Sequence, residues 1–150
     1  MGCGSTGVAR IAQEPELTLV DTSAWVEFLR GTGSPVGIQL RGLLENRASL
    51  ATTEPIVMEV LAGARDDSHL RRLRQLVLSC RLLPVRGLAD YEEAATLYRT
   101  CRRAGLTVRR LVDCLIAVVA IDADAVLLQA DSDFPLIAQR TGLRLLPPVV

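Results

Sequence analysis

The chain has 150 residues, of which 17 are arginine and 17 are acidic, so its formal charge at neutral pH is zero. It contains no lysine and a single histidine, His69. Without lysine, the chain cannot be a P-loop NTPase, a protein kinase or a pyridoxal enzyme, because each of these needs a lysine. A neutral chain with only five aromatic residues also lacks the basic field of a histone-like binder and the stacking platform of a single-strand binding sheet.

Composition predicts one compact domain. Hydrophobic residues make up 49% of the chain, which is enough at this length to build a core without metals or disulfides. The four cysteines form no C-x-x-C pair, so we expect free thiols in a reducing cytoplasm. No apolar run is long enough to cross a bilayer, so no membrane segment is expected. Residues 1–16 are expected to be a disordered leader before a single domain at 17–150.

Strand-like and helical patterns alternate from residue 17 onward. In chain order, we expect a strand at 17–20, helices at 24–30 and 38–45, a strand at 49–51, helices at 56–64 and 70–78, a strand at 81–85, helices at 89–104 and 111–121, a strand at 125–128, a helix at 134–140 and a strand at 143–146. This alternation predicts an α/β fold, a three-layer sandwich with a mostly parallel central sheet. Ligands of such sheets bind at the carboxyl ends of the strands.

Four acidic residues stand where apolar core is expected. Asp21 directly follows the first expected strand, and Asp131 follows the fourth, so both should lie at one edge of the sheet. Glu59 and Asp113 interrupt apolar helices, where a charge is rarely placed without a partner. Four such acids favour a shared site that holds a hard cation, Mg²⁺ or Mn²⁺, since carboxylates without histidine or cysteine suit these ions.

Each acid taken alone also has a purely structural interpretation. Asp21 could cap the following helix, and Asp113 could pair with Arg109 or Arg110, four and three residues before it. Asp122 lies out of phase with Asp113 and is expected to face solvent at the end of its helix. These alternatives remain open at the level of sequence.

Four short motifs surround the four acids. They read Val20-Asp21-Thr22-Ser23-Ala24-Trp25, Glu59-Val60-Leu61-Ala62-Gly63, Asp113-Cys114-Leu115-Ile116-Ala117 and Asp131-Ser132-Asp133-Phe134. In this order, over residues 17–146, they resemble the PIN-domain ribonucleases, specifically the VapC-type toxins of bacterial and archaeal toxin–antitoxin pairs. The resemblance implies that the catalytic and metal-binding residues are Asp21, Glu59, Asp113 and Asp131, with Asp133, Ser23 and Thr22 as auxiliary residues.

Two positions bear on this assignment. Glu54 is a rival to Glu59, although the Glu-Val-Leu-Ala-Gly context favours Glu59. Gln129 stands where members of the family often have Thr or Ser, which puts one hydrogen bond at the edge of the site in doubt.

The resemblance also implies a function and partners. The protein is expected to be a cytoplasmic, homodimeric, Mg²⁺-dependent endoribonuclease that cleaves RNA, inhibits growth and is itself inhibited by a small cognate antitoxin. The arginines that could line a path for RNA are Arg99, Arg102, Arg103, Arg109 and Arg110. Arginines at a helix end also offset the helix dipole, and we weigh the two interpretations evenly.

Trp25, Phe28 and Leu29 give the first helix an apolar face, part of which is expected to be exposed and to contact the antitoxin. Core packing is expected for at least one of the three, and Trp25 is expected to contact the antitoxin and to contribute more to that complex than to the fold.

Two other functions stay open. One is a PIN-like binding or assembly module without catalysis. The other is a phosphatase-like hydrolase with Asp21 as nucleophile, which the missing lysine and D-x-D motif disfavour.

Overall fold

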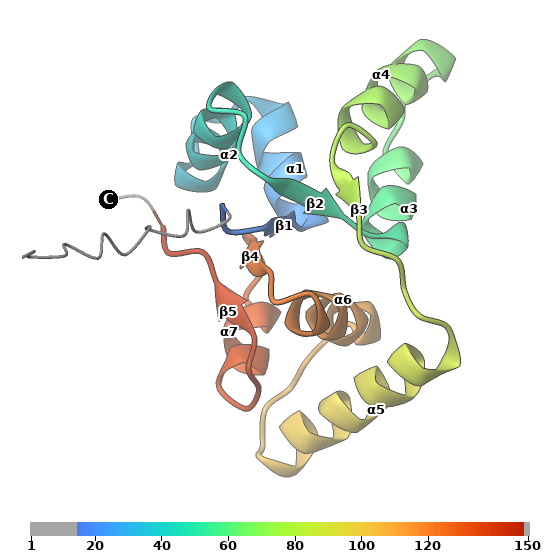
Figure 1. The fold of residues 1–150 in the computed structure, drawn as a ribbon, viewed down its shortest axis with the longest axis vertical. Helices are drawn as coiled ribbons and strands as arrows, with labels where there is room; N and C mark the ends of the chain where they lie inside the picture. The colour runs from blue at the N-terminus through green and yellow to red at the C-terminus, as the bar shows by residue number, and fades with distance from the viewer. Residues whose placement is uncertain (1–14, 149–150) are drawn as a thin grey trace, which may run out of the picture.

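The computed structural model describes residues 15–148 and contains one five-stranded sheet in the order β3-β2-β1-β4-β5 (Figure 1). All four strand pairings are parallel. The elements are β1 (Thr18–Val20), α1 (Thr22–Arg30), α2 (Pro35–Glu45), β2 (Leu50–Thr52), α3 (Glu54–Ala62), α4 (Asp67–Val77), β3 (Arg81–Leu82), α5 (Leu88–Arg103), α6 (Leu111–Asp122), β4 (Val126–Leu128), α7 (Asp133–Ala138) and β5 (Arg144–Leu145). The predicted α/β fold with a parallel sheet is confirmed.

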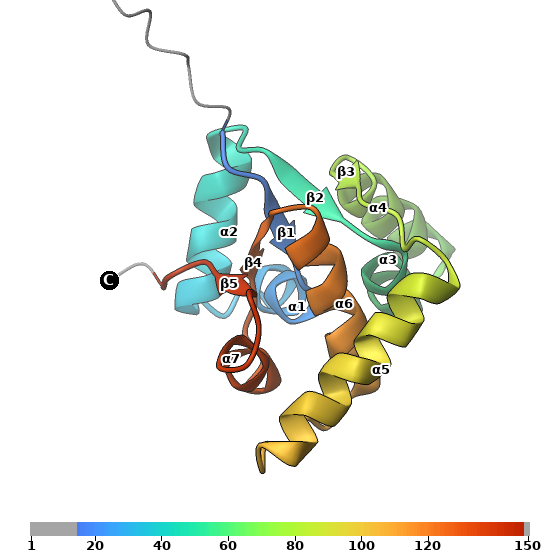
Figure 2. The ribbon, with the colours of Figure 1, turned by 60° about the horizontal axis from the view of Figure 1, so that its bottom comes forward.

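The helices form two groups. Helices α1 to α4 connect β1 to β2 and β2 to β3, in one direction across the sheet, and α1 packs against both α2 and α3. Helices α5 to α7 lie on the return path through β4 to β5 and pack against one another. Since parallel crossovers are right-handed, the two directions place the two groups on opposite faces. Figure 2 shows α6 in front of β1 and α1 behind it.

The first four helices, α1 to α4, start two or three residues earlier than the apolar periodicity predicts, whereas α5 to α7 start within one residue of the prediction. The Asp21 side chain accepts a hydrogen bond from Ser23 N–H at the start of α1. Ser34 caps α2, whose first residue is Pro35, and Asp66 caps α4. These capping residues are polar and so do not contribute to the apolar pattern, although they are the residues that start helices. His69 lies in the first turn of α4, and its backbone N–H donates to the Asp66 side chain.

The core lies around α6, the central strand β1 and its neighbour β4. Leu19, Val20 and Leu127 are fully buried, as is nearly all of α6 after its second residue. Strand β3 ends at Leu82 rather than at residue 85, because Pro84 has no N–H to extend the ladder. The apolar strands therefore form the middle of a sheet whose two faces are covered by helices, and α6 is the most apolar of these.

The apolar face of α1 is mostly core. Trp25 is 1% exposed, and Phe28 packs edge-on against it with ring centroids 6.2 Å apart. Only Leu29 of the three is well exposed, at 44%. The expectation that Trp25 contacts a partner is therefore wrong: this large ring is needed to fill the space between α1 and its neighbours.

The expected leader falls largely on residues 1–14, which lie outside the described residues. Glu16, the last residue of that expected segment, forms an ion pair with Arg144 of β5. Within residues 15–148, no helix is long and apolar enough to span a membrane. In the same part of the chain, Cys80, Cys101 and Cys114 are free thiols, as expected.

Candidate active site

The site begins where the two central strands end. In the parallel register, Val20 of β1 pairs with Leu128 of β4, and Asp21 N–H donates to Leu128 O at 2.9 Å. The chain segments that follow the two strands therefore leave the sheet side by side, although more than a hundred residues separate them. This arrangement brings the first and last motifs to one edge, as the sequence predicts.

Asp21 both caps α1 and faces the site. Its Oδ2 accepts hydrogen bonds from Ser23 N–H at 2.9 Å and from Ser23 O–H at 2.5 Å. The Ser23 oxygen in turn accepts from Ala130 N–H at 2.9 Å, which links the ends of β1 and β4. Burial raises the pKa of Asp21 above its ordinary value, against the lowering effect of the Ser23 hydrogen bonds. The capping and site interpretations of Asp21 are therefore compatible.

Thr22, the other hydroxyl of the first motif, has a different surrounding. Its Oγ1 is buried and has no hydrogen-bond partner among residues 15–148. The structure therefore supports the predicted positioning role of Ser23 by a direct contact, and gives no such contact for Thr22.

Three carboxylates form the centre of the site. Asp113 at the start of α6, Asp131 after β4 and Asp133 at the start of α7 each offer an oxygen, and these oxygens lie within 4.8 Å of one another. Asp113 is 1% exposed, and burial raises its pKa to about 7, with a further raising effect from the neighbouring carboxylates and a lowering effect from Arg110. Asp113 is thus the acid of this group whose charge is most costly without a cation nearby.

Arg109 holds two of these acids together. Its backbone N–H donates to Asp133 Oδ2 at 3.0 Å and its Nε to Asp133 Oδ1 at 3.1 Å. Its Nη2 donates to Asp131 Oδ1 at 3.0 Å and to Ser132 Oγ at 3.1 Å. Arg109 therefore fixes the turn between β4 and α7. It does not form the ion pair with Asp113 that helical spacing had suggested.

Glu59 lies on α3, across the site from that turn. It forms an ion pair with Arg110 through Oε2, while its Oε1 is buried without a hydrogen-bond partner in the described part of the chain. The ion-pair partner of Arg110 is thus an acid other than Asp113, as it is for Arg109. Neither arginine forms the pair with Asp113 that spacing along the helix suggested. The Glu59 charge also raises the pKa of Asp21, so Glu59 lies near the acid group without belonging to the three carboxylates at its centre.

The structure also separates Glu59 from its rival. Glu54 Oε2 accepts from Val85 N–H at 2.9 Å and from Thr53 O–H at 3.2 Å, so Glu54 ties the segment after β3 to α3. Gln129, the departure from the family pattern, accepts from Asp131 N–H at 2.7 Å through Oε1. A hydrogen bond at the edge of the site is therefore present despite the exchange of residue type.

The donor set fits a hard divalent cation. All of the acidic side chains offer oxygen, and the unpaired buried oxygens within residues 15–148 include Asp113 Oδ2 and Glu59 Oε1. A buried carboxylate oxygen without a partner is unfavourable, and a bound cation would satisfy it. The auxiliary Asp133 has both oxygens engaged by Arg109, whereas Asp131 Oδ2 accepts none of the hydrogen bonds described above.

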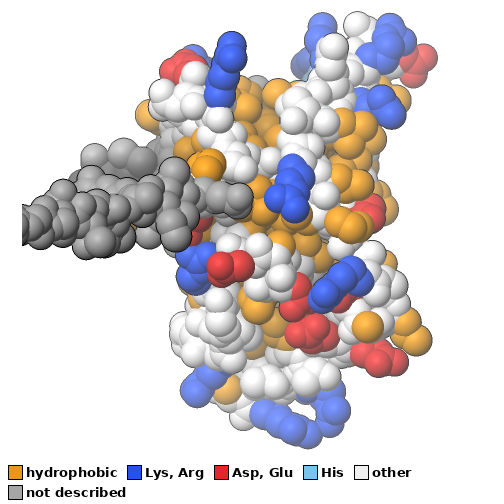
Figure 3. All heavy atoms as spheres, viewed as in Figure 1, with side chains coloured by type: hydrophobic (Ala, Val, Ile, Leu, Met, Phe, Trp, Pro, Cys, Tyr) orange, Lys and Arg blue, Asp and Glu red, His pale blue; other side chains and the backbone are white. Residues whose placement is uncertain are grey.

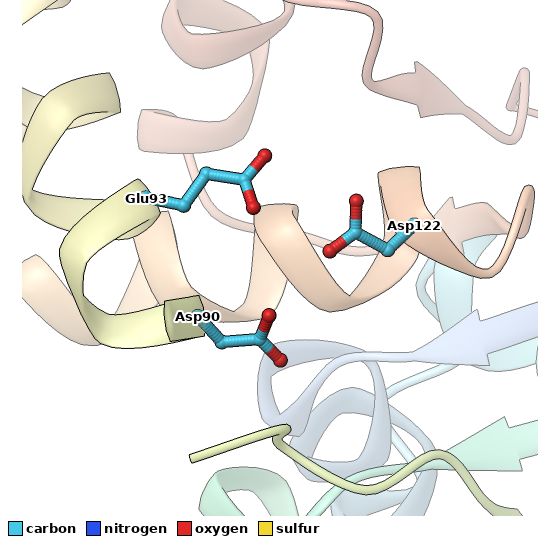
Figure 4. A group of neighbouring side chains, drawn as sticks. All are labelled: Asp90, Glu93 and Asp122. Atoms are coloured by element: carbon cyan, nitrogen blue, oxygen red, sulfur yellow. The ribbon is translucent and has the colours of Figure 1, made fainter. Parts of the chain in front are cut away.

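A second acid group lies between α5 and α6, and sequence reasoning missed it. Asp90, Glu93 and Asp122 point toward one another (Figure 4). Arg86 pairs with both Asp90 and Asp122, and Asp90 also accepts from Arg86 N–H at 2.7 Å. Asp122 is exposed, as expected, but its carboxylate has this arginine partner, so the group is a structural clamp on the segment before α5.

The remaining predicted RNA-binding arginines lie on α5. Arg99, Arg102 and Arg103 are exposed on that helix, and Arg102 lies 5.8 Å from the centroid of the Tyr98 ring. Figure 3 shows basic side chains over the end of α5 and over α4 rather than in one continuous field. All five predicted arginines are therefore exposed, but three lie on α5 and the other two, Arg109 and Arg110, pair with acids of the site.

Comparison with known proteins agrees with this architecture. The PIN domain family model matches residues 18–139. Ribonuclease VapC11 of Mycobacterium tuberculosis is 46% identical over 129 residues, which cover 85% of this chain and 96% of that protein. A VapC ribonuclease of Mycobacterium bovis matches with the same identity and coverage.

Solved structures share the fold at low sequence identity. FitAcB from Neisseria gonorrhoeae has a TM-score of 0.67 at 21% identity, covering 87% of this chain and 97% of that one. VapC20 of Mycobacterium tuberculosis, described as a Sarcin-Ricin loop cleaving toxin, has a TM-score of 0.63 at 19% identity, covering 85% and 98%. VapBC-1 from Haemophilus influenzae has a TM-score of 0.66 at 17% identity, covering 87% and 96%. The chain belongs to the PIN-domain family and, within it, to the VapC ribonucleases.

Proposed function

We propose that the protein is a Mg²⁺-dependent endoribonuclease, able to use Mn²⁺, and the toxin of a type II toxin–antitoxin pair. The observation that supports this most is the convergence of Asp113, Asp131 and Asp133 within 4.8 Å, with Asp21 and Glu59 beside them. The 46% identity to proteins named VapC ribonucleases supports RNA as the substrate and disfavours a PIN-like module without catalysis.

The chemistry is hydrolysis of a phosphodiester. A bound Mg²⁺ would supply a more acidic water and neutralise charge on the phosphate. The water oxygen bonds to phosphorus as the bond to the leaving oxygen breaks, and the proton that the water loses to solvent is matched by one that the leaving oxygen takes up to become a hydroxyl. Asp113 would be among the residues that hold this cation, because its Oδ2 is buried without a hydrogen-bond partner in the described part of the chain. Ser23 holds Asp21 in one orientation, so this carboxylate needs little rearrangement to bind a cation.

RNA is expected to approach across the surface arginines of α5. Arg99, Arg102 and Arg103 lie on one helix face by spacing and are exposed, so they can contact phosphates outside the reacting group. A chain with zero net charge needs such a local patch to hold a polyanion.

The proposed partners are a small cognate antitoxin and a second copy of the chain. Several structural neighbours are described as VapBC complexes, which supports an antitoxin. Exposed apolar side chains are available for protein contacts, including Leu29 at 44% and Ile38 at 59%. The site of action would be the cytoplasm, where RNA is abundant and the free thiols of Cys80, Cys101 and Cys114 are stable.

The test is RNA cleavage by purified protein with Mg²⁺, with Mn²⁺ and with EDTA. Cleavage is expected with either cation and is expected to stop in EDTA. Asp21→Asn, Glu59→Gln, Asp113→Asn and Asp131→Asn should each reduce the rate by at least about a hundredfold. Glu54→Gln is the matched control for Glu59→Gln, because it keeps the oxygen that accepts from Val85.

Cleavage that persists in EDTA would contradict the metal assignment. Loss of cleavage in Glu54→Gln together with full cleavage in Glu59→Gln would show that the wrong glutamate was chosen. Inactivity of the wild-type protein on every RNA class tested, with the cation bound, would favour the module without catalysis.

A further inference from the structure

We infer that Arg110 is the resident counter-ion of Glu59, that a divalent cation entering the acid site competes with it for this carboxylate, and that Arg110 thereby sets the cation concentration at which the enzyme becomes active. The inference rests on the proposed function, since it takes the acid group as the cation site. It assigns to Arg110 a positioning role, because it acts on the cation through Glu59.

Two adjacent arginines serve opposite sides of the site. Residue 110 has an extended backbone, with φ −126° and ψ 120°, and precedes α6. Successive side chains of extended backbone point in opposite directions. Accordingly, Arg109 reaches Asp131 and Asp133 after β4, whereas Arg110 reaches Glu59 on α3.

The two arginines differ in how firmly they are held. Arg109 donates from its backbone N–H, Nε and Nη2, and its partner Asp133 is 1% exposed. Arg109 is the more exposed side chain, at 62% against 46% for Arg110, so the difference lies in the contacts: Glu59 is the only ion-pair partner of Arg110 within residues 15–148. An exposed guanidinium with one partner can move into water with little loss of free energy. Arg110 is therefore the arginine that a cation displaces more easily from its carboxylate partner.

The Glu59 carboxylate is half satisfied. Oε2 is paired with Arg110, while Oε1 is buried and lacks a partner in the described residues. A cation near Asp113 and Asp131 could bind Glu59 and relieve that deficit. Because the cation and the guanidinium are both positive, they repel each other at one carboxylate, so binding of one disfavours the other.

The test measures cation binding without RNA. Mn²⁺ binding is followed by electron paramagnetic resonance and Mg²⁺ binding by calorimetry, for the wild type, Arg110→Gln and Arg41→Gln. Arg110→Gln is expected to bind both cations roughly three- to tenfold more tightly. Arg41→Gln makes the same change of net charge at an exposed position of α2 and is expected to bind them as the wild type does.

A double-mutant cycle separates competition at Glu59 from a general effect of charge. Glu59→Gln is expected to weaken cation binding, and adding Arg110→Gln to it is expected to increase the affinity by less than the same substitution does in the wild type. The shared carboxylate is then gone, and only the effect of the Arg110 charge on Asp113 and Asp21 remains. Arg110→Lys keeps the charge near Glu59 and is expected to stay within about twofold of the wild type. Thermal melting of each variant checks that it folds.

Each outcome bears on one of the two proposals. Unchanged affinity in Arg110→Gln, or an equal gain in the Glu59→Gln background, would overturn the role of Arg110 while leaving the ribonuclease assignment intact. The expected affinities together with a wild type that cleaves no RNA would overturn the assignment and keep the role of Arg110. A wild type that binds neither cation would overturn both.

Discussion

Asp113 combines deep burial with an unpaired oxygen, and this combination makes the stability of the protein depend on pH. Burial raises the pKa of Asp113 to about 7 in the folded protein, whereas an aspartate carboxyl in the unfolded chain has an ordinary pKa near 3.9. Between these values the folded state holds a proton that the unfolded state has lost. The free energy of unfolding therefore falls as pH rises through this window and levels off above it.

Asp113→Asn removes this titration. In EDTA, we expect the variant to be more stable than the wild type by about 1–3 kcal/mol near pH 8, and nearly equal to it near pH 4. Urea unfolding at both pH values measures the difference. A variant that is less stable than the wild type at the higher pH would show that the Asp113 charge is already compensated by its neighbours.

The Ser23 hydroxyl joins the segments that follow β1 and β4, through one hydrogen bond to Asp21 and one from Ala130. Ser23→Ala removes a hydrogen bond to Asp21 and leaves the Ala130 N–H without its acceptor. We expect a loss of about 1–2 kcal/mol in unfolding free energy, together with slower cleavage, because Asp21 loses a contact that orients it. Ser79→Ala is the control, since this hydroxyl donates to Leu76 O at an exposed turn far from the acids in sequence. Equal effects of the two substitutions would contradict a special role for Ser23.

At the scale of elements, α1 separates core from surface within one short helix. Trp25→Ala should destabilise the fold by about 3–5 kcal/mol, since the ring is 1% exposed and packs against Phe28. Leu29→Ala should cost less than about 1 kcal/mol in the isolated protein and weaken the complex with the antitoxin. Thermal melting and pull-down of co-expressed antitoxin measure the two effects. A strong loss of binding in Trp25→Ala at unchanged stability would reverse this interpretation of α1.

The elements also show how far sequence reasoning reaches. Apolar runs predict every strand and helix. Burial requires continuous hydrophobic segments in β1, β2 and β4, whereas the edge strands β3 and β5 are exposed or only partly buried. Starts at Thr22, Pro35 and Asp67 lie outside that pattern, since they depend on capping. The positions of Asp113 within an apolar helix and of Asp131 after a strand predict two of the three carboxylates that meet at the sheet edge. The third, Asp133, is expected only from the family resemblance and only as an auxiliary residue. The partners of Arg109 and Arg110 could not be predicted, because spacing along a helix suggests contacts with Asp113 and says nothing about contacts with acids on other elements.

At the scale of the whole molecule, the described core begins at Leu17 and is built from residues that follow it. Removing residues 1–14 should therefore change the melting temperature by less than about 2 °C and leave cleavage intact. The ion pair of Glu16 with Arg144 remains in that variant, and both side chains are half exposed, so the pair itself contributes little. Differential scanning calorimetry of the two proteins measures the shift. A large fall would show that the first fourteen residues belong to the domain and would contradict the predicted boundary.

The sheet order has a consequence for when the protein can act. β1 lies at the centre of the sheet and is synthesised early, but its neighbour β4 and the acids Asp131 and Asp133 come from the last part of the chain. Domains complete their folding only when the segments that pair have all been synthesised. A nascent chain, or one shortened by a nonsense codon or a protease before residue 131, thus carries Asp21 and Glu59 without a complete acid group. Ribonuclease activity therefore starts only after nearly the whole chain has been synthesised, and it is the full-length protein that the antitoxin has to inhibit.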